Sequence, residues 1–483
     1  MKRLISNVKN TFGLNKIPLT NTNFNSPTST PSTIIIHKNP KSKIASNLFQ
    51  MQSSNEIKSN KDSEMFLQTS RQKKANNTYN EVEGPEPDYN NAGFGFETFV
   101  IKEKYVLNHG GYLINPTIAY ETWGTLNSDK SNVILLHTGL SASSHAKSNE
   151  KNSNKGWWQD FIGPGLAIDT SKFFVVCSNV LGSCFGSTGP SSINPETKEP
   201  YGGLFPIITI SDMVRAQVRL LDNLGITKLY ASVGASMGGM QSLCLAAMFP
   251  ERVGRLISIS AAARSHPSSI ALRYMQRQVL MSDPNWNEGN YYSSSYPLQG
   301  MKLARQIATI TYRSGPEWEK RFGRNRSKPN SSPTLDPDFL IETYLDHQGD
   351  NFIKNNKFDP NSMLYISKAM DLFDLSHRNS WLESSTYVKK YSDMSKYDEK
   401  DEFCLMQGCS TVNHPTLIFG IQSDVLFPVW QQKEISDVLK ANGNKNVTYF
   451  ESDSLYGHDT FLIDRVAVGG AIKGLVKKIL TFN

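Results

Sequence analysis

The chain has 483 residues, of which 38% are apolar and 10% aromatic, so it can bury a large core and form two or three folding units. Its formal net charge of +7 comes from residues 1–50, which hold seven Lys or Arg and no acid; the remaining 44 basic and 44 acidic residues balance. This composition excludes a wholly disordered chain and does not support a nucleic-acid-binding surface.

The five cysteines form no Cys-x-x-Cys pair and are odd in number. This pattern argues against a disulfide framework and against a zinc site, and it favours a reducing compartment. No apolar run approaches the roughly 18 residues that a membrane-spanning helix needs, so we expect a soluble protein.

Residues 1–17 predict a basic amphipathic helix without acids, with one apolar face formed by Leu4, Ile5, Val8 and Phe12. The pattern resembles a mitochondrial transit peptide and predicts a location in the mitochondrial matrix; the alternative is a basic tail on a cytoplasmic protein. Residues to about 90 are rich in Ser, Thr, Asn and Lys and cannot supply a packed core. We therefore expect residues 1–90 to be a transit-like, disordered segment outside the fold.

Short apolar runs rich in β-branched residues begin after residue 95 and predict buried parallel strands at 132–136, 172–179, 228–233, 255–260, 416–421 and 447–452. Between them, residues 210–225 carry a helical stripe formed by Met213, Val214, Val218, Leu221 and Leu224. Strands that alternate with helices predict an α/β fold with a mostly parallel, doubly wound sheet.

The alternation stops between residues 265 and 400, where helical patterns such as 300–314 dominate. We interpret this stretch as a helical cap inserted between the first part of the core, 91–264, and the second part, 401–483. A cap over the carboxyl ends of the strands would close the place where such sheets bind ligands.

The sharpest motif is Gly234-Ala235-Ser236-Met237-Gly238, which follows a predicted strand and precedes a helical pattern. Gly-x-Ser-x-Gly at such a junction is the nucleophile elbow of α/β-hydrolases, where small residues flank a serine on a strained turn. The serine hydroxyl then lies beside a helix N-terminus, whose free N–H groups favour developing negative charge. We predict that Ser236 is a nucleophile; an ordinary glycine-rich connection is the alternative.

A serine nucleophile needs a base, and the acid and the histidine are expected in that order further along the chain. Asp424 lies just past the predicted strand 416–421. His458 lies in a loop after the predicted strand 447–452, and it is the only one of nine histidines that combines this position with a preceding glycine. We predict a catalytic triad of Ser236, Asp424 and His458.

An oxyanion hole needs the backbone N–H of the residue after the nucleophile and a second N–H from the loop after an earlier strand. That loop is His137-Thr138-Gly139-Leu140-Ser141-Ala142-Ser143-Ser144-His145, with the donor expected near Gly139 or Leu140. His137 and His145 lack a third ligand at a suitable spacing, so we predict no metal and assign both to shaping the loop. The predicted oxyanion and specificity residues are Met237, Gly139, Leu140, Ser141 and Ala142.

Long motifs in the core and in the cap together resemble the homoserine O-acetyltransferase family of the α/β-hydrolase superfamily, and among its members the serine O-acyltransferase branch is most similar. The resemblance runs from about residue 95 to residue 480 and rests on residues 156–195, 234–241, 281–292, 303–314 and 456–462. It implies a homodimer without a permanent cofactor, with acyl-CoA as co-substrate.

The resemblance also implies a ping-pong transfer in which Ser236 takes an acyl group from acyl-CoA and an amino-acid hydroxyl then takes it from Ser236. In such enzymes an arginine matching Arg305, with Tyr312 nearby, meets the acceptor's carboxylate, and an acid matching Asp459 meets its ammonium. A zwitterion in a closed pocket needs one charge of each sign. From the residues alone, Arg305 would be assigned to a solvated helix face.

The oxyanion loop departs from the His-Ala-Leu-Thr/Ser-Gly sequence of homoserine-acylating members and looks like that of the serine-acylating branch. We therefore expect an acyl-CoA:L-serine O-acyltransferase of cysteine biosynthesis; homoserine O-acetyltransferase of methionine biosynthesis is the alternative, and an esterase the third. The donor is expected to be succinyl-CoA or acetyl-CoA. Arg324 or Arg326 could bind a succinyl carboxylate, although a surface role suits either arginine better.

Overall fold

A computed structural model describes residues 85–86, 93–355, 358–376 and 404–477, all within one structural unit, Thr78–Asn483. The predicted transit-like segment, residues 1–90, therefore lies outside the described residues except for Pro85 and Glu86. Residues 377–400 of the predicted cap also lie outside them.

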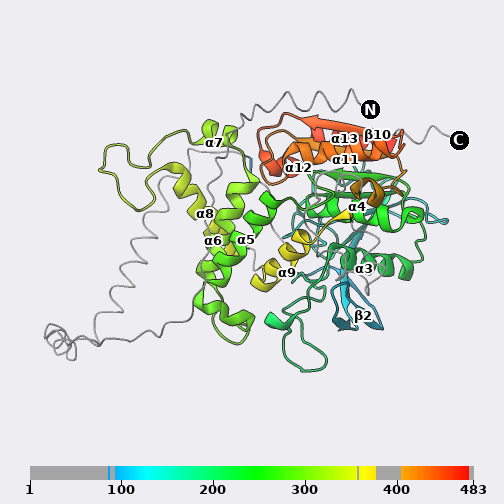
Figure 1. Ribbon diagram of the computed structural model, residues 1–483, viewed down its shortest axis with the longest axis horizontal. Helices are drawn as coiled ribbons and strands as arrows, with labels where there is room; N and C mark the ends of the chain where they lie inside the picture. Colours follow the sequence, from blue (N-terminus) through cyan, green and yellow to red (C-terminus); the bar gives the residue numbers. More distant parts are fainter. Residues whose placement is uncertain (1–84, 87–92, 356–357, 377–403, 478–483) are drawn as a thin grey trace, which may run out of the picture. The chain divides into compact units, whose positions relative to one another are not determined.

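The core is an eight-stranded sheet in the order β1-β4-β6-β5-β7-β8-β9-β10. Figure 1 shows the strand regions to one side of the helices labelled α5, α6 and α8. The pairs β1/β4 and β4/β6 are antiparallel, and all pairs from β6 to β10 are parallel, which confirms the predicted mostly parallel sheet. The strands are β1 (Glu97–Val100), β4 (Thr117–Trp123), β5 (Val133–His137), β6 (Phe174–Ser178), β7 (Ala231–Ala235), β8 (Leu256–Ile259), β9 (Thr416–Ile421) and β10 (Val447–Ser452).

All six predicted strands are present, but one is not buried as expected. β10 forms the edge of the sheet, and most of its residues are partly or fully exposed, because only β9 pairs with it. The sequence also did not predict β1 and β4, or the hairpin of β2 (Lys104–Val106) and β3 (Tyr112–Ile114). These strands mix polar and apolar residues, so they lack the apolar runs of the central strands.

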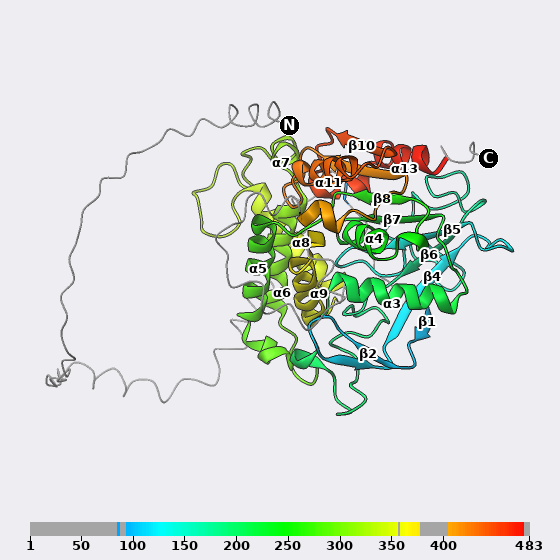
Figure 2. The same cartoon turned by 45° about the vertical axis from the view of Figure 1, so that its right-hand side comes forward.

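Helices cover both faces of the sheet (Figure 2). Alternate residues of β5 divide between two cores: Val133 and Leu135 join one, and Ile134 and Leu136 join the other. The first core is completed by α3 (Ile210–Asn223), α4 (Met237–Met248) and α11 (Val429–Ala441), and the second by α13 (Ala467–Lys477). Helix α3 matches the predicted 210–225 helix and starts with a Thr209/Asp212 capping box.

Between β8 and β9 the described elements are helices, gathered at one side of the sheet in both views (Figures 1 and 2). Helix α6 packs against α5 and α8, and α5 packs against α9. They lie where the helical cap was predicted, and the cap boundaries at 265 and 400 stay predictions. The elements are α5 (Pro267–Met281), η4 (Pro284–Gly289), α6 (Leu298–Tyr312), α7 (Gly315–Arg321), α8 (Leu340–Asn355) and α9 (Pro360–Asp371).

The parallel register brings distant loops to one edge of the sheet. His137 at the end of β5 pairs with Gly234 of β7, and Ile421 at the end of β9 pairs with Ser452 of β10. The oxyanion loop, Ser236, Asp424 and His458 all follow these strand ends. The fold therefore gathers the predicted catalytic residues where α/β sheets bind ligands.

All five cysteines are free thiols, in agreement with their unpaired spacing. In the part of the chain that the structure describes, no helix is both long and apolar enough to cross a bilayer. Within that same part, no cluster of three or more His, Cys, Asp or Glu could hold a metal ion.

Replacing Gly238 by Ala tests the close packing of the elbow against β5. A Cβ at this position would lie 2.4 Å from the carbonyl oxygen of His137, a backbone atom that cannot move aside. We expect Gly238→Ala to lower the free energy of unfolding by about 1–3 kcal/mol, measured by urea denaturation. Gly470→Ala is the control: Gly470 is exposed on α13, nothing lies within 4 Å of an added Cβ, and about 0.5–1 kcal/mol of stabilisation is expected. Equal stability of the two variants would contradict this packing.

Candidate active site

Ser236 lies on a strained turn between β7 and α4. Its φ of 58° and ψ of −128° place a non-glycine residue at positive φ, and 7% of its surface is exposed. A Cβ at Gly234 would lie 2.0 Å from the carbonyl oxygen of Gly238, so the turn closes only with glycine at this position. The geometry is that of a nucleophile elbow.

His458 and Asp424 form a buried pair across two loops. His458 Nδ1 lies 2.7 Å from Asp424 Oδ2, and Asp424 Oδ1 accepts hydrogen bonds from the backbone N–H groups of Leu426 (2.9 Å) and Phe427 (2.8 Å). These donors hold the carboxylate in place. A carboxylate oxygen can only accept, so the hydrogen bond to Asp424 puts an N–H on Nδ1 and leaves Nε2 as the nitrogen that can take a proton from a nucleophile.

The imidazole is held by aromatic rings and by a glycine. The ring of Phe427 stacks on His458 at 5.3 Å, and that of Phe461 meets it edge-on at 5.3 Å. Gly457, at φ 59°, comes so close to α6 that a Cβ would lie 2.7 Å from the carbonyl oxygen of Tyr312. The glycine before His458 thus allows the end of α6 to pack against the histidine loop.

Ser236 and His458 line the same pocket. Of the other predicted site residues, Gly139, Leu140, Ser141, Ala142, Tyr312 and Asp459 also line it, whereas Asp424, Met237 and Arg305 are not among the lining residues. The rest of the lining consists of Trp157, Ala235, Arg273, Gln276, Met370, Leu426, Phe461 and Leu462. Core loops and the helices α5, α6 and α9 therefore share one pocket.

The oxyanion role predicted for Met237 is that of its backbone N–H, and it stays a prediction. Its side chain is fully buried, but it is the first residue of α4, and the N–H groups in the first turn of a helix have no partner within that helix. Buried amides hold the start of the predicted oxyanion loop: Gln241 Nε2 donates to the carbonyl oxygen of Thr138 (2.9 Å), and Gln217 Nε2 donates to Gln241 Oε1 (2.7 Å).

His137 and His145 are buried in structural positions, as predicted. His137 Nε2 lies 2.8 Å from Ser232 Oγ, and burial lowers the pKa of His137 to about 3, so the ring is neutral. His145 Nδ1 lies 2.8 Å from Glu121 Oε2, and Glu121 Oε1 accepts a hydrogen bond from Ser144 Oγ at 2.9 Å. Both ends of the oxyanion loop are thus fixed to the sheet.

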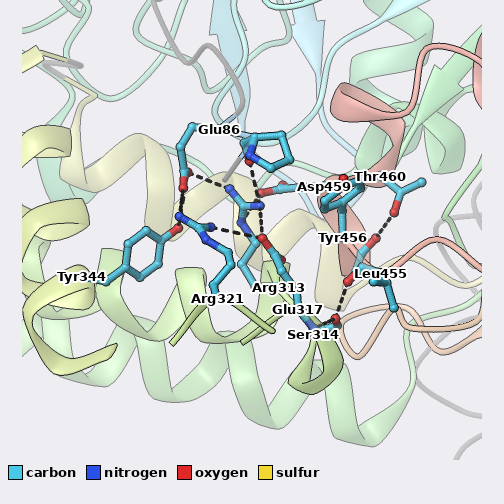
Figure 3. Close-up of polar contacts among 12 residues, drawn as sticks. Glu86, Arg313, Ser314, Glu317, Arg321, Tyr344, Leu455, Tyr456, Asp459 and Thr460 are labelled. Atoms are coloured by element: carbon cyan, nitrogen blue, oxygen red, sulfur yellow. Dashed lines mark hydrogen bonds and ion pairs between the residues drawn. The ribbon is translucent and has the colours of Figure 1, made fainter. Parts of the chain in front are cut away.

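Asp459, the predicted ammonium ligand, belongs to a buried ion cluster shown in Figure 3. Arg313 Nε lies 3.2 Å from Asp459 Oδ2, Arg313 Nη1 lies 2.9 Å from Glu317 Oε1, and Arg313 Nη2 lies 2.6 Å from Glu86 Oε2. Arg321 bridges Glu317 and Glu86 from the other side. Asp459 is therefore oriented by a cation that the sequence analysis did not single out, although Arg313 directly follows Tyr312 in the cap motif.

Burial raises the pKa of Glu317 above its ordinary value, while Arg313 and Arg321 oppose this rise and Asp459 reinforces it.

The end of α6 is also hydrogen-bonded to the histidine loop. Ser314 caps α7 by accepting a hydrogen bond from the N–H of Glu317, and its hydroxyl donates to the carbonyl oxygen of Leu455 (Figure 3).

Arg305, the predicted carboxylate ligand, is 5% exposed on α6, with its guanidinium 5.5 Å from the ring centroid of Tyr312 and 4.9 Å from that of Phe352. Arg305 lies next to the Tyr312 ring but does not line the pocket, and its role in binding stays a prediction. Burial raises the pKa of Tyr312; Arg305 and Arg273 oppose this rise, and Asp459 adds to it. Three charged side chains therefore act on one pocket tyrosine.

Arg324 and Arg326, considered for a succinyl carboxylate, are not among the pocket-lining residues. Arg324 is exposed near the ring of Phe339, and Arg326 Nε lies 3.0 Å from both carboxylate oxygens of Asp338. The cation that does line the pocket is Arg273 of α5, which the sequence analysis missed. The only available signal was its place on an amphipathic helix, which does not separate a buried arginine from a solvated one.

Residues 132–464 match the family model described as the alpha/beta hydrolase fold. The chain is 53% identical over 430 residues to the serine O-succinyltransferase of Emericella nidulans, covering 81% of this chain and 82% of the relative. It is 51% identical over 432 residues to that of Schizosaccharomyces pombe, covering 81% and 85%. Identity to the homoserine O-acetyltransferase of Methanosalsum zhilinae is 43% over 381 residues, covering 78% and 72%.

Two solved structures are similar in fold and in sequence. Esterase E22 superposes with a TM-score of 0.68 at 28% identity, covering 79% of this chain and 100% of that chain. The homoserine O-acetyltransferase of Bacillus anthracis gives a TM-score of 0.68 at 28% identity, covering 80% and 98%.

Replacing Asp424 by Asn tests the orientation of the imidazole. The amide can donate a hydrogen bond to Nδ1, which would favour the tautomer with its proton on Nε2, and we expect kcat to fall by about 10³–10⁴-fold. Asp453→Asn, an exposed acid in the same loop as His458, should leave kcat within about twofold. A loss of less than about tenfold for Asp424→Asn would contradict the triad.

Replacing Arg313 by Leu tests the buried ion cluster. Glu317 and Asp459 would lose a buried cation, so we expect about 3–5 kcal/mol of destabilisation at pH 7.5. The folded-state pKa of Glu317, already raised, would rise further; a raised carboxyl pKa destabilises only above the unfolded-state value, so the deficit should shrink toward pH 5. Urea denaturation at both pH values measures this.

Arg465→Leu is the matched control, because Arg465 pairs with Asp160 on the exposed surface. It should cost less than about 1 kcal/mol at either pH. A pH-independent deficit in Arg313→Leu would show that lost packing, and not the uncompensated carboxylates, explains the change in stability.

Proposed function

This chain belongs to the homoserine O-acetyltransferase family of the α/β-hydrolase fold, and we propose that it is an acyl-CoA:L-serine O-acyltransferase. The observation that carries the proposal is the pocket itself, which brings the nucleophile Ser236, the base His458 and the buried carboxylate of Asp459 together. The similarity to two fungal serine O-succinyltransferases supports serine as the acceptor.

In the first half-reaction, Ser236 Oγ attacks the thioester carbonyl carbon while His458 Nε2 takes its proton. The tetrahedral oxyanion would be stabilised by the N–H of Met237 and by an N–H of the 139–142 loop. Collapse breaks the carbon–sulfur bond, His458 returns the proton to the leaving thiolate, and CoA departs. The acyl group remains as an ester on Ser236, and Asp424 has stabilised the transient imidazolium.

In the second half-reaction, the hydroxyl of L-serine takes the place of the thiol. His458 removes its proton, the oxygen attacks the acyl carbon, and the bond to Ser236 Oγ breaks as His458 protonates that oxygen. The product is an O-acyl-L-serine, which suits a cysteine-forming pathway. Asp459 is proposed to bind the acceptor's ammonium group, which would bring the hydroxyl to the acyl carbon.

To be specific, the enzyme must distinguish two acceptors by their length, because L-serine is one methylene shorter than homoserine. Residues Gly139 to Ala142 line the pocket beside Ser236, so their side chains and backbone set the space available to the acceptor. A pocket of this kind discriminates one methylene by about 10–200-fold. Some transfer to homoserine is therefore expected.

Two other reactions are compatible with the same elbow and triad. Homoserine O-acetylation is favoured by the 43% identical relatives, and ester hydrolysis by the similarity to esterase E22. The esterase reaction requires water to reach the acyl-enzyme in place of an amino acid. Release of CoA only when an amino acid is present would exclude it.

We also propose that residues 1–90 direct the protein to the mitochondrial matrix and that the enzyme is a homodimer. The basic, acid-free N-terminal helix pattern supports the first proposal, and the family resemblance supports the second. A fluorescent fusion carrying residues 1–90 and analytical ultracentrifugation of the purified enzyme test them separately.

Steady-state kinetics with each acceptor tests the proposed reaction. We expect kcat/KM for L-serine to exceed that for L-homoserine by about 10–200-fold, with acyl-CoA as donor and CoA release as the readout. Ser236→Ala should abolish transfer to both acceptors. A preference for homoserine would contradict the serine assignment, and full activity of Ser236→Ala would contradict the mechanism.

A further inference from the structure

Arg273 is a buried cation in the wall of the catalytic pocket. It is 2% exposed, and it lines the same pocket as Ser236 and His458. Its Nε lies 2.6 Å from Asp371 Oδ1, and its Nη2 donates to Ser265 Oγ at 2.9 Å. Its Nη1 is buried and has no hydrogen-bond partner among the residues that the structure describes.

The charge around Arg273 is not balanced within its own cluster. Arg277, one turn further along α5, binds the other oxygen of the same carboxylate, with Nη2 2.5 Å from Asp371 Oδ2. Two guanidinium groups thus share one carboxylate, which leaves one positive charge in excess. Guanidinium groups stay protonated in proteins, so an anionic ligand would relieve both the excess charge and the unpaired Nη1.

A second polar side chain lies beside Arg273 in the pocket wall. Gln276 is 5% exposed, lines the pocket, and follows Arg273 by three residues on α5, which places both side chains on the same face of the helix. An arginine fork with a neighbouring amide is a suitable receptor for a carboxylate. An acetyl group offers nothing to this receptor, whereas the acyl chain of a dicarboxylic acid ends in a carboxylate.

The acceptor's charges have a separate place. Asp459 belongs to the cluster around Arg313, at the end of α6 and in the histidine loop, and Arg305 stands behind Tyr312 on α6. Arg273 instead belongs to the wall formed by α5 and α9, through Asp371. With Arg305 assigned to the acceptor's carboxylate, as predicted, Arg273 of the pocket lining is left for another anion.

We propose that Arg273, together with Gln276, binds the distal carboxylate of a dicarboxylic acyl group, and thereby selects succinyl-CoA over acetyl-CoA. The inference rests on the proposed acyl transfer through Ser236 and names its donor class. The acyl chain keeps this contact while its carbonyl carbon passes from the thioester sulfur to Ser236 Oγ and then to the acceptor oxygen. With an acetyl donor the buried Nη1 stays unpaired, which disfavours that donor.

Acylation of the full-length enzyme without an acceptor tests the proposal. The rate of the CoA-release burst is measured with succinyl-CoA and with acetyl-CoA, for the wild type and for Arg273→Gln. We expect the wild type to prefer succinyl-CoA, and the ratio of the two acylation efficiencies to fall by at least about 30-fold in Arg273→Gln. The KM for L-serine, measured separately, should not change in parallel.

Arg277→Gln is the matched control. Arg277 also binds Asp371, but it is not among the pocket-lining residues. Its donor ratio should stay at the wild-type value. If Arg273→Gln does not fold, Arg273→Lys carries the test: it keeps a cation near Asp371 but loses the fork, and the donor ratio should still fall.

The inference would be overturned by a wild-type preference for acetyl-CoA, by an equal loss with both donors, or by the same change of donor ratio in Arg277→Gln. A raised KM for L-serine with an unchanged donor ratio would assign Arg273 to the acceptor's carboxylate and also overturn it. Failure of the serine assignment would be distinct, because the burst is measured without any acceptor: the enzyme would acylate normally and then transfer to homoserine or water.

Discussion

The backbone turn at Ser236 is the constraint on which the rest of the site depends. A serine at positive φ is stable only because glycines flank it: Gly234 closes against Gly238, and Gly238 packs against the end of β5. The same packing sets where the oxyanion loop begins, because that loop leaves β5 at His137. One strained residue thus fixes the nucleophile, the N-terminus of α4 and the start of the oxyanion loop relative to one another.

Parallel strand register then supplies the other catalytic groups. β9 and β10 end at the same level of the sheet. The loops that follow them therefore bring Asp424 Oδ2 and His458 Nδ1 to a distance of 2.7 Å. Buried polar side chains hold the oxyanion loop after β5 without metals or disulfides among the described residues: Gln241 binds the carbonyl oxygen of Thr138, and Glu121 binds His145. Because buried polar groups must find partners, each of these hydrogen bonds also specifies one loop conformation.

Sequence patterns were sufficient for the parts governed by local rules. The central strands are continuous apolar runs, the elbow has a fixed glycine spacing, and an acid or histidine just past a strand end must lie at the active edge of a parallel sheet. The charge clusters follow no such rule. Arg273 pairs with Asp371, about a hundred residues further along the chain. Arg313 pairs with Glu86, which precedes the first strand of the core. Nothing in the sequence of α5 indicates that Arg273 is buried. Likewise, nothing in the sequence of α6 indicates that Arg305 is buried next to the Tyr312 ring.

The pocket thus has two charge clusters, one around Asp459 and the other around Arg273. In the proposed mechanism the first binds the acceptor and the second binds the acyl group, and Ser236 carries the acyl group from one half-reaction to the next. The most direct test of this central role is peptide mass spectrometry of the enzyme quenched after rapid mixing with succinyl-CoA. A succinyl group should appear on the peptide that contains Ser236, and it should leave as O-succinyl-L-serine when L-serine is added. Transfer of the acyl group without any covalent label on Ser236, or a label on another residue, would contradict the mechanism.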